Sequence, residues 1–360
     1  MRKIRYGIIG FGGIAEVRLA KEGFGLDTTR FDGNPVAELV AAYDPNPLRQ
    51  HAAEALGISW RTSVEEMLRD SSIDAIVVAT NNKNHAVVAQ KALQAGKHVF
   101  IEKPAGVTLK EIRNLIKEGK KRSLSIGVDH MMTKNSYNRL TKALLEANTI
   151  GCVAHMVLHM EFAFGTTPGE AATWRCSDPS ELGGPIGDVG SHCLYMAEYL
   201  AGSRVRSLQA VYAPKHLDIA VEDGALINFT LENGIQGIAR VAFDQPRGAL
   251  ESNLSNLGYE IYGSEGSIEG RGTLFQLSGH PDEPVALELS ATIHGKRTDY
   301  RPEKIENIYA LQLAEHARSI VTGNLLDGSE ALHNLELVVH AHESAANGGS
   351  LKMVTPPEEE

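Results

Sequence analysis

Residues 7–16 read GIIGFGGIAE, and this stretch decides the fold of the first half of the chain. An apolar run at 5–9 leads into Gly10, Gly12 and Ala15, which match the pattern G-x-G-x-x-G/A. Gly10 permits a tight turn, Gly12 lets the main chain approach a pyrophosphate, and Ala15 allows a helix to pack closely on a strand. The helix that opens here offers free N–H groups and a partial positive charge to phosphate groups. The stretch therefore predicts a strand, a turn and a helix that bind a dinucleotide.

The rest of the first third alternates between short apolar runs and helical patterns. Apolar runs lie at 5–9, 37–43, 74–79, 98–101 and 124–128, and helical patterns lie at 13–20, 47–56, 85–95 and 109–121. Thr108 and Glu111 form a capping box before the last of these helices, and Gly96 suits the end of the helix before it. Apolar strands separated by helices are typical of a parallel sheet that is buried on both faces. We therefore expect residues 1–128 to form a doubly wound α/β domain, a Rossmann fold.

The pattern changes after residue 128. Helical patterns lie at 131–147, 188–200, 307–322 and 331–346, and strand-like runs lie at 152–164, 205–212, 224–231, 235–243 and 259–262. Asn233 and Gly234 form a hairpin turn between two of these runs. Strands joined by tight turns favour an open, mostly antiparallel sheet with helices on one face. We therefore expect residues 129–360 to form an α+β domain.

Composition and charge exclude several classes of function. The 360 residues carry a formal net charge of -10 and show no basic stripe with interleaved aromatics, which argues against nucleic acid as a partner. No run of about 18 apolar residues exists, so we expect no membrane span. Three cysteines without a C-x-x-C pair suit reduced thiols in a cytoplasmic protein. Without an H-E-x-x-H or paired-cysteine pattern, we also expect no metal.

Polar residues follow the strands of the first domain, at the edge of the sheet where ligands bind in such folds. Asp44 ends the second strand, where a carboxylate binds ribose hydroxyls and repels a 2′-phosphate. This position favours NAD, while the nearby Arg49 leaves NADP open as an alternative. Thr80 and Asn82 follow the third strand. His85 opens the next helix, and we favour a structural hydrogen bond there over catalysis.

The stretch at 98–106, HVFIEKPAG, places charge at the end of a buried strand. Lys103 is either a solvated residue at a strand end or a group beside the nicotinamide half of a dinucleotide. We give Glu102 a structural and no catalytic part. The predicted cofactor-binding residues are Gly10, Gly12, Gly13, Ile14, Asp44, Thr80, Asn82, His85, Glu102 and Lys103.

Three stretches together resemble the Gfo/Idh/MocA family of oxidoreductases. They are GIIGFGGIAE at 7–16, ATNNKNHAVVAQKALQAGKHVFIEKP at 79–104 and WRCSDPSELGGPIGDVGSH at 174–192. The resemblance covers nearly the whole chain and implies a Rossmann domain for NAD or NADP and a C-terminal domain for substrate and oligomer contacts. It also implies that Lys103 matches the lysine of the family's E-K-P motif and that Asp188 and His192 match its D-x-G-x-H pair.

These three residues suit hydride transfer between a secondary alcohol and nicotinamide, which requires a group that handles the hydroxyl proton. An unperturbed histidine such as His192 titrates at about 6.5 and so serves in both directions. Asp188 lies four positions earlier on a helical pattern, one turn away on the same face, where it orients the imidazole or binds a substrate hydroxyl. Lys103, desolvated beside a cationic ring, would have a lowered pKa and could join the proton relay.

The resemblance implies a sugar, a cyclic polyol or a sugar derivative as the substrate. We expect the substrate-binding residues to be Lys103, His130, Trp174, Arg175, Asp188 and His192. His130 and Met131 depart from the aromatic–arginine character that is commoner in the family, which leaves the substrate open. Two alternatives remain: an enzyme that retains NAD for transient oxidation in glycoside cleavage or sugar-to-sugar transfer, and a non-catalytic dinucleotide sensor. The resemblance also implies a homodimer or homotetramer.

Overall fold

The protein, seen in a computed structural model, is described at residues 2–244, 256–271 and 287–355. The chain divides into two compact units. The first comprises Met1–Met131 and Asn307–Leu335, and the second comprises Met132–Glu306 and Glu336–Glu360. The sequence prediction assigned everything after residue 128 to the second domain. The structure instead gives 307–335 to the first unit, because helix α9 (Ile308–Thr322) packs against η1 (Ile14–Gly23).

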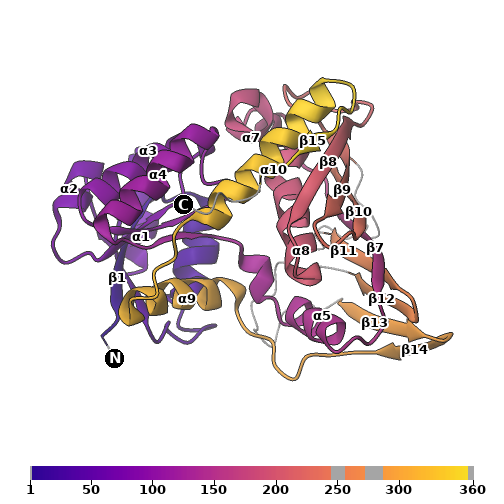
Figure 1. Cartoon of the computed structure of the whole chain (residues 1–360). Coiled ribbons are helices and arrows are strands. Elements are labelled where there is room, and N and C mark those ends of the chain that lie inside the picture. Colours follow the sequence, from indigo (N-terminus) through magenta and orange to yellow (C-terminus); the bar gives the residue numbers. More distant parts are fainter. Residues whose placement is uncertain (1, 245–255, 272–286, 356–360) are drawn as a thin grey trace. The chain divides into compact units, whose positions relative to one another are not determined.

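The first unit contains a six-stranded sheet, and all of its strand pairs are parallel. The strand order is β3-β2-β1-β4-β5-β6. Figure 1 draws this sheet in indigo and purple and labels β1. The strands are β1 (Ile4–Ile9), β2 (Ala37–Tyr43), β3 (Ser59–Trp60), β4 (Ala75–Val78), β5 (His98–Ile101) and β6 (Ile126–Val128). Every residue of β4 is buried, as expected of a central strand covered on both faces. The predicted doubly wound parallel sheet is confirmed; the short β3 was not predicted.

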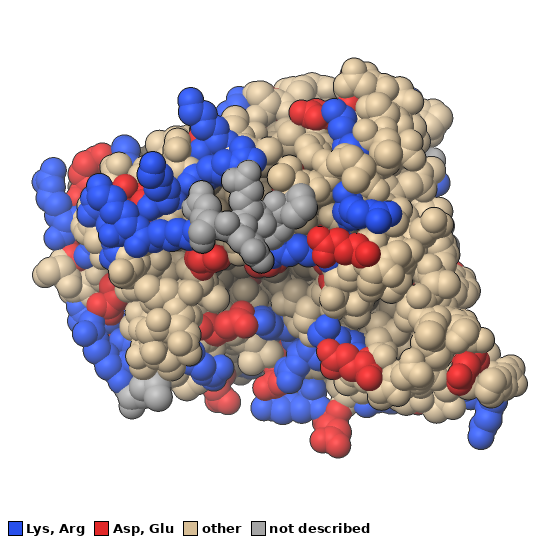
Figure 2. Space-filling model, in the orientation of Figure 1, with Lys and Arg blue, Asp and Glu red and all other residues tan. Residues whose placement is uncertain are grey.

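Helices alternate with these strands. They are η1, η2 (Pro47–Arg49), α1 (Gln50–Ala55), α2 (Val64–Arg69), α3 (Asn82–Gln94) and α4 (Leu109–Arg122). The sequence predicted all of them except α2. The Thr108 hydroxyl accepts a hydrogen bond from the Glu111 N–H, which confirms the predicted start of α4. Figure 2 shows Lys and Arg side chains gathered over α3 and α4, and α4 ends in Lys120, Lys121 and Arg122. Cations there stabilise the helix, because its C-terminal end carries partial negative charge.

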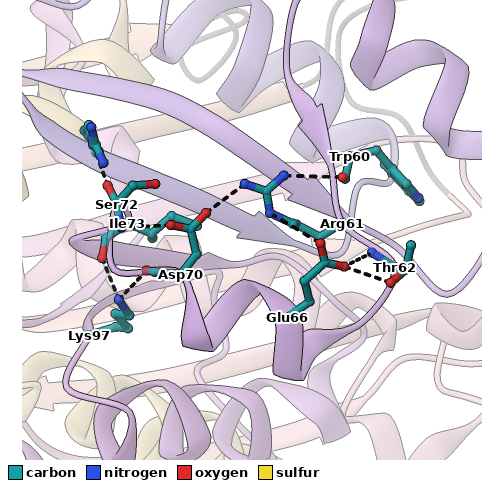
Figure 3. Close-up of polar contacts among 9 residues, drawn as sticks. Trp60, Arg61, Thr62, Glu66, Asp70, Ser72, Ile73 and Lys97 are labelled. Carbon is teal, nitrogen blue, oxygen red and sulfur yellow. Dashed lines mark hydrogen bonds and ion pairs between the residues drawn. The ribbon is translucent and has the colours of Figure 1, made fainter.

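A polar network closes the loop between α2 and β4 (Figure 3). Lys97 is 7% exposed, and its ammonium donates to the carbonyl oxygens of Asp70 at 2.7 Å and Ile73 at 2.8 Å. The Asp70 carboxylate accepts from Arg61 at 2.7 Å and from the Ser72 N–H at 2.8 Å. The two carbonyl oxygens provide hydrogen-bond acceptors for the buried Lys97 ammonium at the amino-terminal side of the sheet. Lys97 therefore serves the fold, in contrast to Lys103 at the carboxyl ends of the strands.

The second unit is built on a nine-stranded sheet of order β14-β13-β12-β11-β7-β10-β9-β8-β15. Its strands are β7 (Val153–Glu161), β8 (Val205–Tyr212), β9 (Gly224–Leu231), β10 (Gln236–Ala242), β11 (Asn256–Gly263), β12 (Gly266–Arg271), β13 (Glu288–Ile293), β14 (Lys296–Asp299) and β15 (Lys352–Met353). Within this nine-stranded sheet, β7 and β10 are the only parallel pair among the described residues. The predicted open, mostly antiparallel sheet is confirmed, and Gly234 turns the predicted hairpin with φ at 90°.

The helices of the second unit are mostly short. They are α5 (Ser136–Glu146), α6 (Pro168–Ala171), α7 (Trp174–Ser177), η4 (Pro179–Glu181), η5 (Ile186–Gly190) and α8 (Ser191–Ala201). η3 (Met131–Lys134) and α10 (Ser329–Ala346) each include residues of both units. α8 packs against β7 and β10, and its first seven residues, Ser191–Ala197, are all buried. Among the described residues, no helix combines the length and apolar character that crossing a membrane requires.

Candidate functional site

The glycine turn of the first unit leaves open space in front of its main chain. Gly10 has φ at 91°, and a Cβ there would lie 2.6 Å from the carbonyl carbon of Ala79, so only glycine fits. At Gly12 and Gly13 an added Cβ would meet no atom within 4 Å. The packing of the fold therefore does not require glycine at these two positions, whereas close approach of a phosphate group does. Ala15 is 1% exposed and provides the close packing.

Asp44 ties the glycine turn to the end of β2. Its carboxylate accepts from the Phe11 N–H and from the Asn46 N–H, both at 2.8 Å. Arg49 reaches the same turn from η2, where its Nε donates to the Phe11 carbonyl oxygen at 2.7 Å. Asp44 thus stays at the edge where a ribose would bind, and it also stabilises the turn.

Glu16 pairs with both cations that approach this edge. It lies in the first turn of η1, forms an ion pair with Arg49 and accepts from Lys21 at 2.7 Å. The hydrogen bond from Lys21, with a further one from Arg49, lowers the pKa of Glu16. Arg49 is therefore neutralised where a free arginine would bind the 2′-phosphate of NADP. Sequence reasoning weighed Arg49 but missed Glu16.

His85 joins the ends of two adjacent strands. It is 1% exposed, with Nε2 2.9 Å from the Thr80 carbonyl oxygen and Nδ1 2.7 Å from the Pro104 carbonyl oxygen. Thr80 follows β4 and Pro104 follows β5, so the ring holds together two loops of the predicted cofactor edge. Asn82, 5% exposed, begins the same helix.

Glu102 and Lys103 follow β5 at the carboxyl end of the sheet, as predicted, and both are partly exposed. The adjacent strand β6 ends in Val128 and is followed by Asp129, which is 0% exposed. Burial, together with the neighbouring Glu102, raises the pKa of Asp129 well above its usual range, and the charge of Lys103 opposes this rise. Sequence reasoning missed Asp129. Its place directly after a strand, at the same edge as Glu102, was the signal that could have found it.

Three predicted substrate-binding residues of the second unit lie together. Arg175 Nε lies 3.3 Å from Asp188 Oδ1, and the Arg175 guanidinium lies 4.5 Å from the centre of the Trp174 ring. Trp174 and Arg175 belong to α7, and Asp188 belongs to η5. The arrangement combines a cation, a carboxylate and an aromatic face, which are groups that bind hydroxyls and the apolar face of a sugar ring. His130 lies in the first unit, 8% exposed, directly after Asp129.

His192 is the second residue of α8 and is 3% exposed. Its Nδ1 lies 2.7 Å from the hydroxyl oxygen of Tyr195, one turn further along the same helix. This hydrogen bond fixes the orientation of the ring. We predicted that Asp188 orients the imidazole or binds a substrate hydroxyl, and this stays a prediction. Sequence reasoning missed Tyr195, although the spacing of three residues on one helix face could have indicated it.

Glu222 anchors the segment that carries Asp188. Its Oε1 accepts from the Ile186 N–H, the first residue of η5, at 3.0 Å. Gly184, with φ at 69°, packs so closely that a Cβ would lie 2.6 Å from the Glu222 carboxylate. Burial raises the pKa of Glu222 to about 7. The side chain borders a cavity of about 420 Å³, which Tyr212, Lys215 and His342 also line.

In the part of the chain that the structure describes, one group of side chains has the spacing of metal ligands. His216, Asp223 and Asp244 each offer an atom within 4.8 Å of the others. Contacts within the protein account for this grouping. Asp223 Oδ2 accepts from the Leu217 N–H at 2.8 Å, and His216 Nδ1 lies 2.5 Å from Asp244 Oδ2. The sequence prediction of no metal stays a prediction.

Comparisons with known proteins agree with this geometry. Residues 4–130 match the family model of oxidoreductases with an NAD-binding Rossmann fold, and residues 138–269 match the GFO/IDH/MocA C-terminal domain. A 1,5-anhydro-D-fructose reductase of Ensifer adhaerens is 25% identical over 98% of this chain and 99% of its own length. The scyllo-inositol 2-dehydrogenase (NAD(+)) of Bacillus subtilis is 27% identical over 87% of this chain and 88% of its own length.

A solved structure has the same fold over both units. The aldose–aldose oxidoreductase of Caulobacter crescentus, crystallised with glycerol, superposes with a TM-score of 0.81. The match covers 98% of this chain and 100% of that one at 21% identity. The two family models follow one another along the chain in the order that the sequence resemblance implied. The chain therefore belongs to the GFO/IDH/MocA family of oxidoreductases.

Proposed function

We propose that the protein is an NAD-dependent dehydrogenase or reductase of a sugar, a cyclic polyol or a sugar derivative. It would transfer a hydride between nicotinamide and a secondary hydroxyl or ketone. The observation that supports this most is the open main chain at Gly12 and Gly13, at the same sheet edge as Lys103. Parallel sheets of this type bind dinucleotides at that edge.

The edge residues suit NAD better than NADP. When bound, the nicotinamide ring would supply the hydride acceptor or donor. The N–H groups at Gly13 and Ile14 would hold the phosphates, and Asp44 would bind the ribose hydroxyls. Glu16 neutralises Arg49, and this removes a cation that would attract a 2′-phosphate.

The proton of the substrate hydroxyl would be held and moved by Lys103 and His192. Oxidation of an alcohol releases this proton, and reduction of a ketone takes it up, so the same two groups serve both directions. The Tyr195 hydroxyl would fix the His192 ring through Nδ1. Asp188 and Arg175 would bind neighbouring substrate hydroxyls.

The names of the relatives support polyhydroxylated cyclic substrates, since they act on 1,5-anhydro-D-fructose and scyllo-inositol. Purified protein should therefore be offered a panel of inositols, anhydro sugars, aldoses and nucleotide sugars with NAD or NADP. Formation of the reduced cofactor is followed by absorbance. A substrate that is oxidised faster with NAD supports the proposal. Turnover with NADP only would contradict the cofactor assignment, and no turnover across the panel in either direction would contradict the reaction.

A second candidate is an enzyme that keeps its cofactor and passes hydride from one sugar to another. The aldose–aldose oxidoreductase of C. crescentus, which shares the fold, gives this candidate its support. An assay after removal of all free nucleotide distinguishes the two candidate functions. A protein that still converts paired sugars without added NAD, and releases no NADH, is a transfer enzyme rather than a dehydrogenase.

We further propose that the protein is a homodimer or homotetramer assembled through its nine-stranded sheet. Large apolar side chains lie exposed on β8, β9 and β11, namely Val211, Tyr212, Leu226 and Tyr262. Apolar side chains gathered on one sheet indicate an interaction surface. Light scattering should give two or four times the mass of 38.9 kDa. Leu226→Lys should reduce it to the mass of the monomer.

A further inference from the structure

Two carboxyl groups lie next to each other at the ends of adjacent strands in the first unit. β5 and β6 pair in parallel with Ile101 opposite Val128, so Glu102 and Asp129 follow at neighbouring positions. The Asp129 N–H donates to the Ile101 carbonyl oxygen at 2.9 Å, which continues the ladder past the last paired residues. The two side chains therefore leave the sheet at the edge that carries Lys103.

The Asp129 carboxyl group is enclosed. The residue is 0% exposed, and neither of its carboxyl oxygens has a hydrogen-bond donor among the described residues. A buried carboxylate without such donors costs several kcal/mol. Two ionised carboxylates are both acceptors and cannot bond to each other. A hydrogen bond between Glu102 and Asp129 therefore forms only when one of them carries a proton.

The deeper group is the one that should carry it. Glu102 is partly exposed and Asp129 is not, so ionisation costs less at Glu102. The charges around the pair do not reverse this order. Lys103 is the cation whose charge acts on Asp129. On α9, Tyr309 is 3% exposed and is neutral, since burial raises its pKa well above its usual range.

We propose that Asp129 is a positioning residue for Lys103. Its carboxyl group stays protonated and donates a hydrogen bond to Glu102, so that Glu102 alone carries negative charge beside the lysine. The bond fixes the Glu102 side chain, and Glu102 in turn restrains the ammonium that follows it in the chain. The catalytic consequence rests on the proposed function of Lys103, whereas the shared proton does not.

A neutral Asp129 also balances the charges at this edge. With both carboxylates ionised, two negative charges would face the Lys103 ammonium. With one carboxylate ionised, one negative charge faces one positive charge.

Infrared spectroscopy tests the shared proton without any turnover. The protein is labelled with carbon-13 in its aspartate carboxyl groups alone, so that the carboxyl group of Glu222 does not contribute to the isotope-edited spectrum. Spectra of this protein, free of substrate and cofactor, should contain the C=O stretch of a protonated aspartic acid near pH 7. That band should vanish in Asp129→Asn and persist in the matched control Asp74→Asn, which changes an aspartate at the opposite end of the sheet. Wild-type protein without the band, or a band that survives Asp129→Asn, would overturn the proposal.

Kinetics test the positioning role. Asn keeps a donor for Glu102, and Leu has a similar volume and no donor. Because loss of a hydrogen bond to a charged group costs about 1.5–3 kcal/mol, Asp129→Leu should lower kcat about 10-fold or more, with less than ~3-fold change in the Kd for NADH. Asp129→Asn should retain at least about a third of the wild-type kcat. Equal losses in both variants would show that Asp129 works as a carboxylate and would overturn the proposal. If no substrate is found, the infrared result still decides where the proton lies.

Discussion

The imidazole of His85 lies 2.7 Å from the carbonyl oxygen of Pro104, and its other ring nitrogen lies 2.9 Å from the carbonyl oxygen of Thr80. Both acceptors belong to the main chain and neither can donate. The imidazole donates through an N–H and contacts both carbonyl oxygens. His85 therefore holds the residue after Lys103 against the loop that follows β4.

Replacing His85 by phenylalanine should loosen this edge. A buried carbonyl that loses its donor costs about 1–3 kcal/mol, so His85→Phe should lower the free energy of unfolding by about that amount. We also expect weaker NADH binding, measured by fluorescence titration. His85→Asn, which can donate one hydrogen bond, should fall between wild type and His85→Phe. His51→Phe, an exposed site on α1, is the control. Unchanged stability and NADH affinity in His85→Phe would contradict this role.

Lys103→Ala and His192→Ala should leave folding intact and lower kcat by at least ~100-fold, which is the usual contribution of a general acid or base. Circular dichroism checks the fold and initial rates check the turnover. Lys110→Ala, on the exposed side of α4, is the matched control for the lysine. Undiminished turnover in either variant would remove that residue from the proton relay.

Tyr195→Phe removes the hydroxyl that contacts His192 Nδ1 and keeps the ring. A single hydrogen bond contributes about 0.5–1.5 kcal/mol, so kcat should fall by roughly 2–12-fold. The pH profile of kcat should shift as well, because the bond biases the protonation of the ring. KM for NAD should not change. Tyr199→Phe, on the same helix, should leave the profile in place; a shift of equal size there would argue against a specific role of Tyr195.

Glu16→Gln should shift cofactor use toward NADP. The change removes one negative charge and releases Arg49 from its ion pair, so a 2′-phosphate gains a partner and loses a repulsion. We expect the ratio of kcat/KM for NADP to that for NAD to rise by about 10-fold, equivalent to ~1.4 kcal/mol. Glu38→Gln, an exposed site on β2, should not change the ratio. An unchanged ratio in Glu16→Gln would leave discrimination to Asp44 alone.

Glu222 makes the stability of the second unit depend on pH. Its pKa rises from 4.5 to about 7 on folding, so the folded state binds the proton more tightly. The resulting stabilisation is complete below about pH 4.5 and is lost as the pH rises toward 7. Glu222→Gln stays neutral and still accepts from Ile186. The variant should gain on the order of 1–2 kcal/mol over wild type between pH 5 and 8, measured by urea unfolding. A constant difference across this range would contradict the raised pKa.

Much of the fold could be predicted because local patterns and tertiary structure agree. The apolar runs of β1, β2, β4, β5 and β6 and the Thr108 cap of α4 depend on neighbours in sequence, and the structure confirms them. The assignment of 307–335 could not be predicted. Its helix shows only an apolar face, and what covers this face is decided by distant residues, such as the Tyr6 hydroxyl 2.8 Å from His316 Nδ1.

The sequence by itself determined the dinucleotide fold, the glycine turn, the family and the strand end that carries Lys103, because each follows from spacing along the chain. Tertiary structure alone decided two partners of site residues: Glu16 for Arg49 and Asp129 for Glu102. The state of a polar group depends on burial and on the charges next to it. Residues far apart in sequence supply most of that environment, so it is defined only when the sheet has formed.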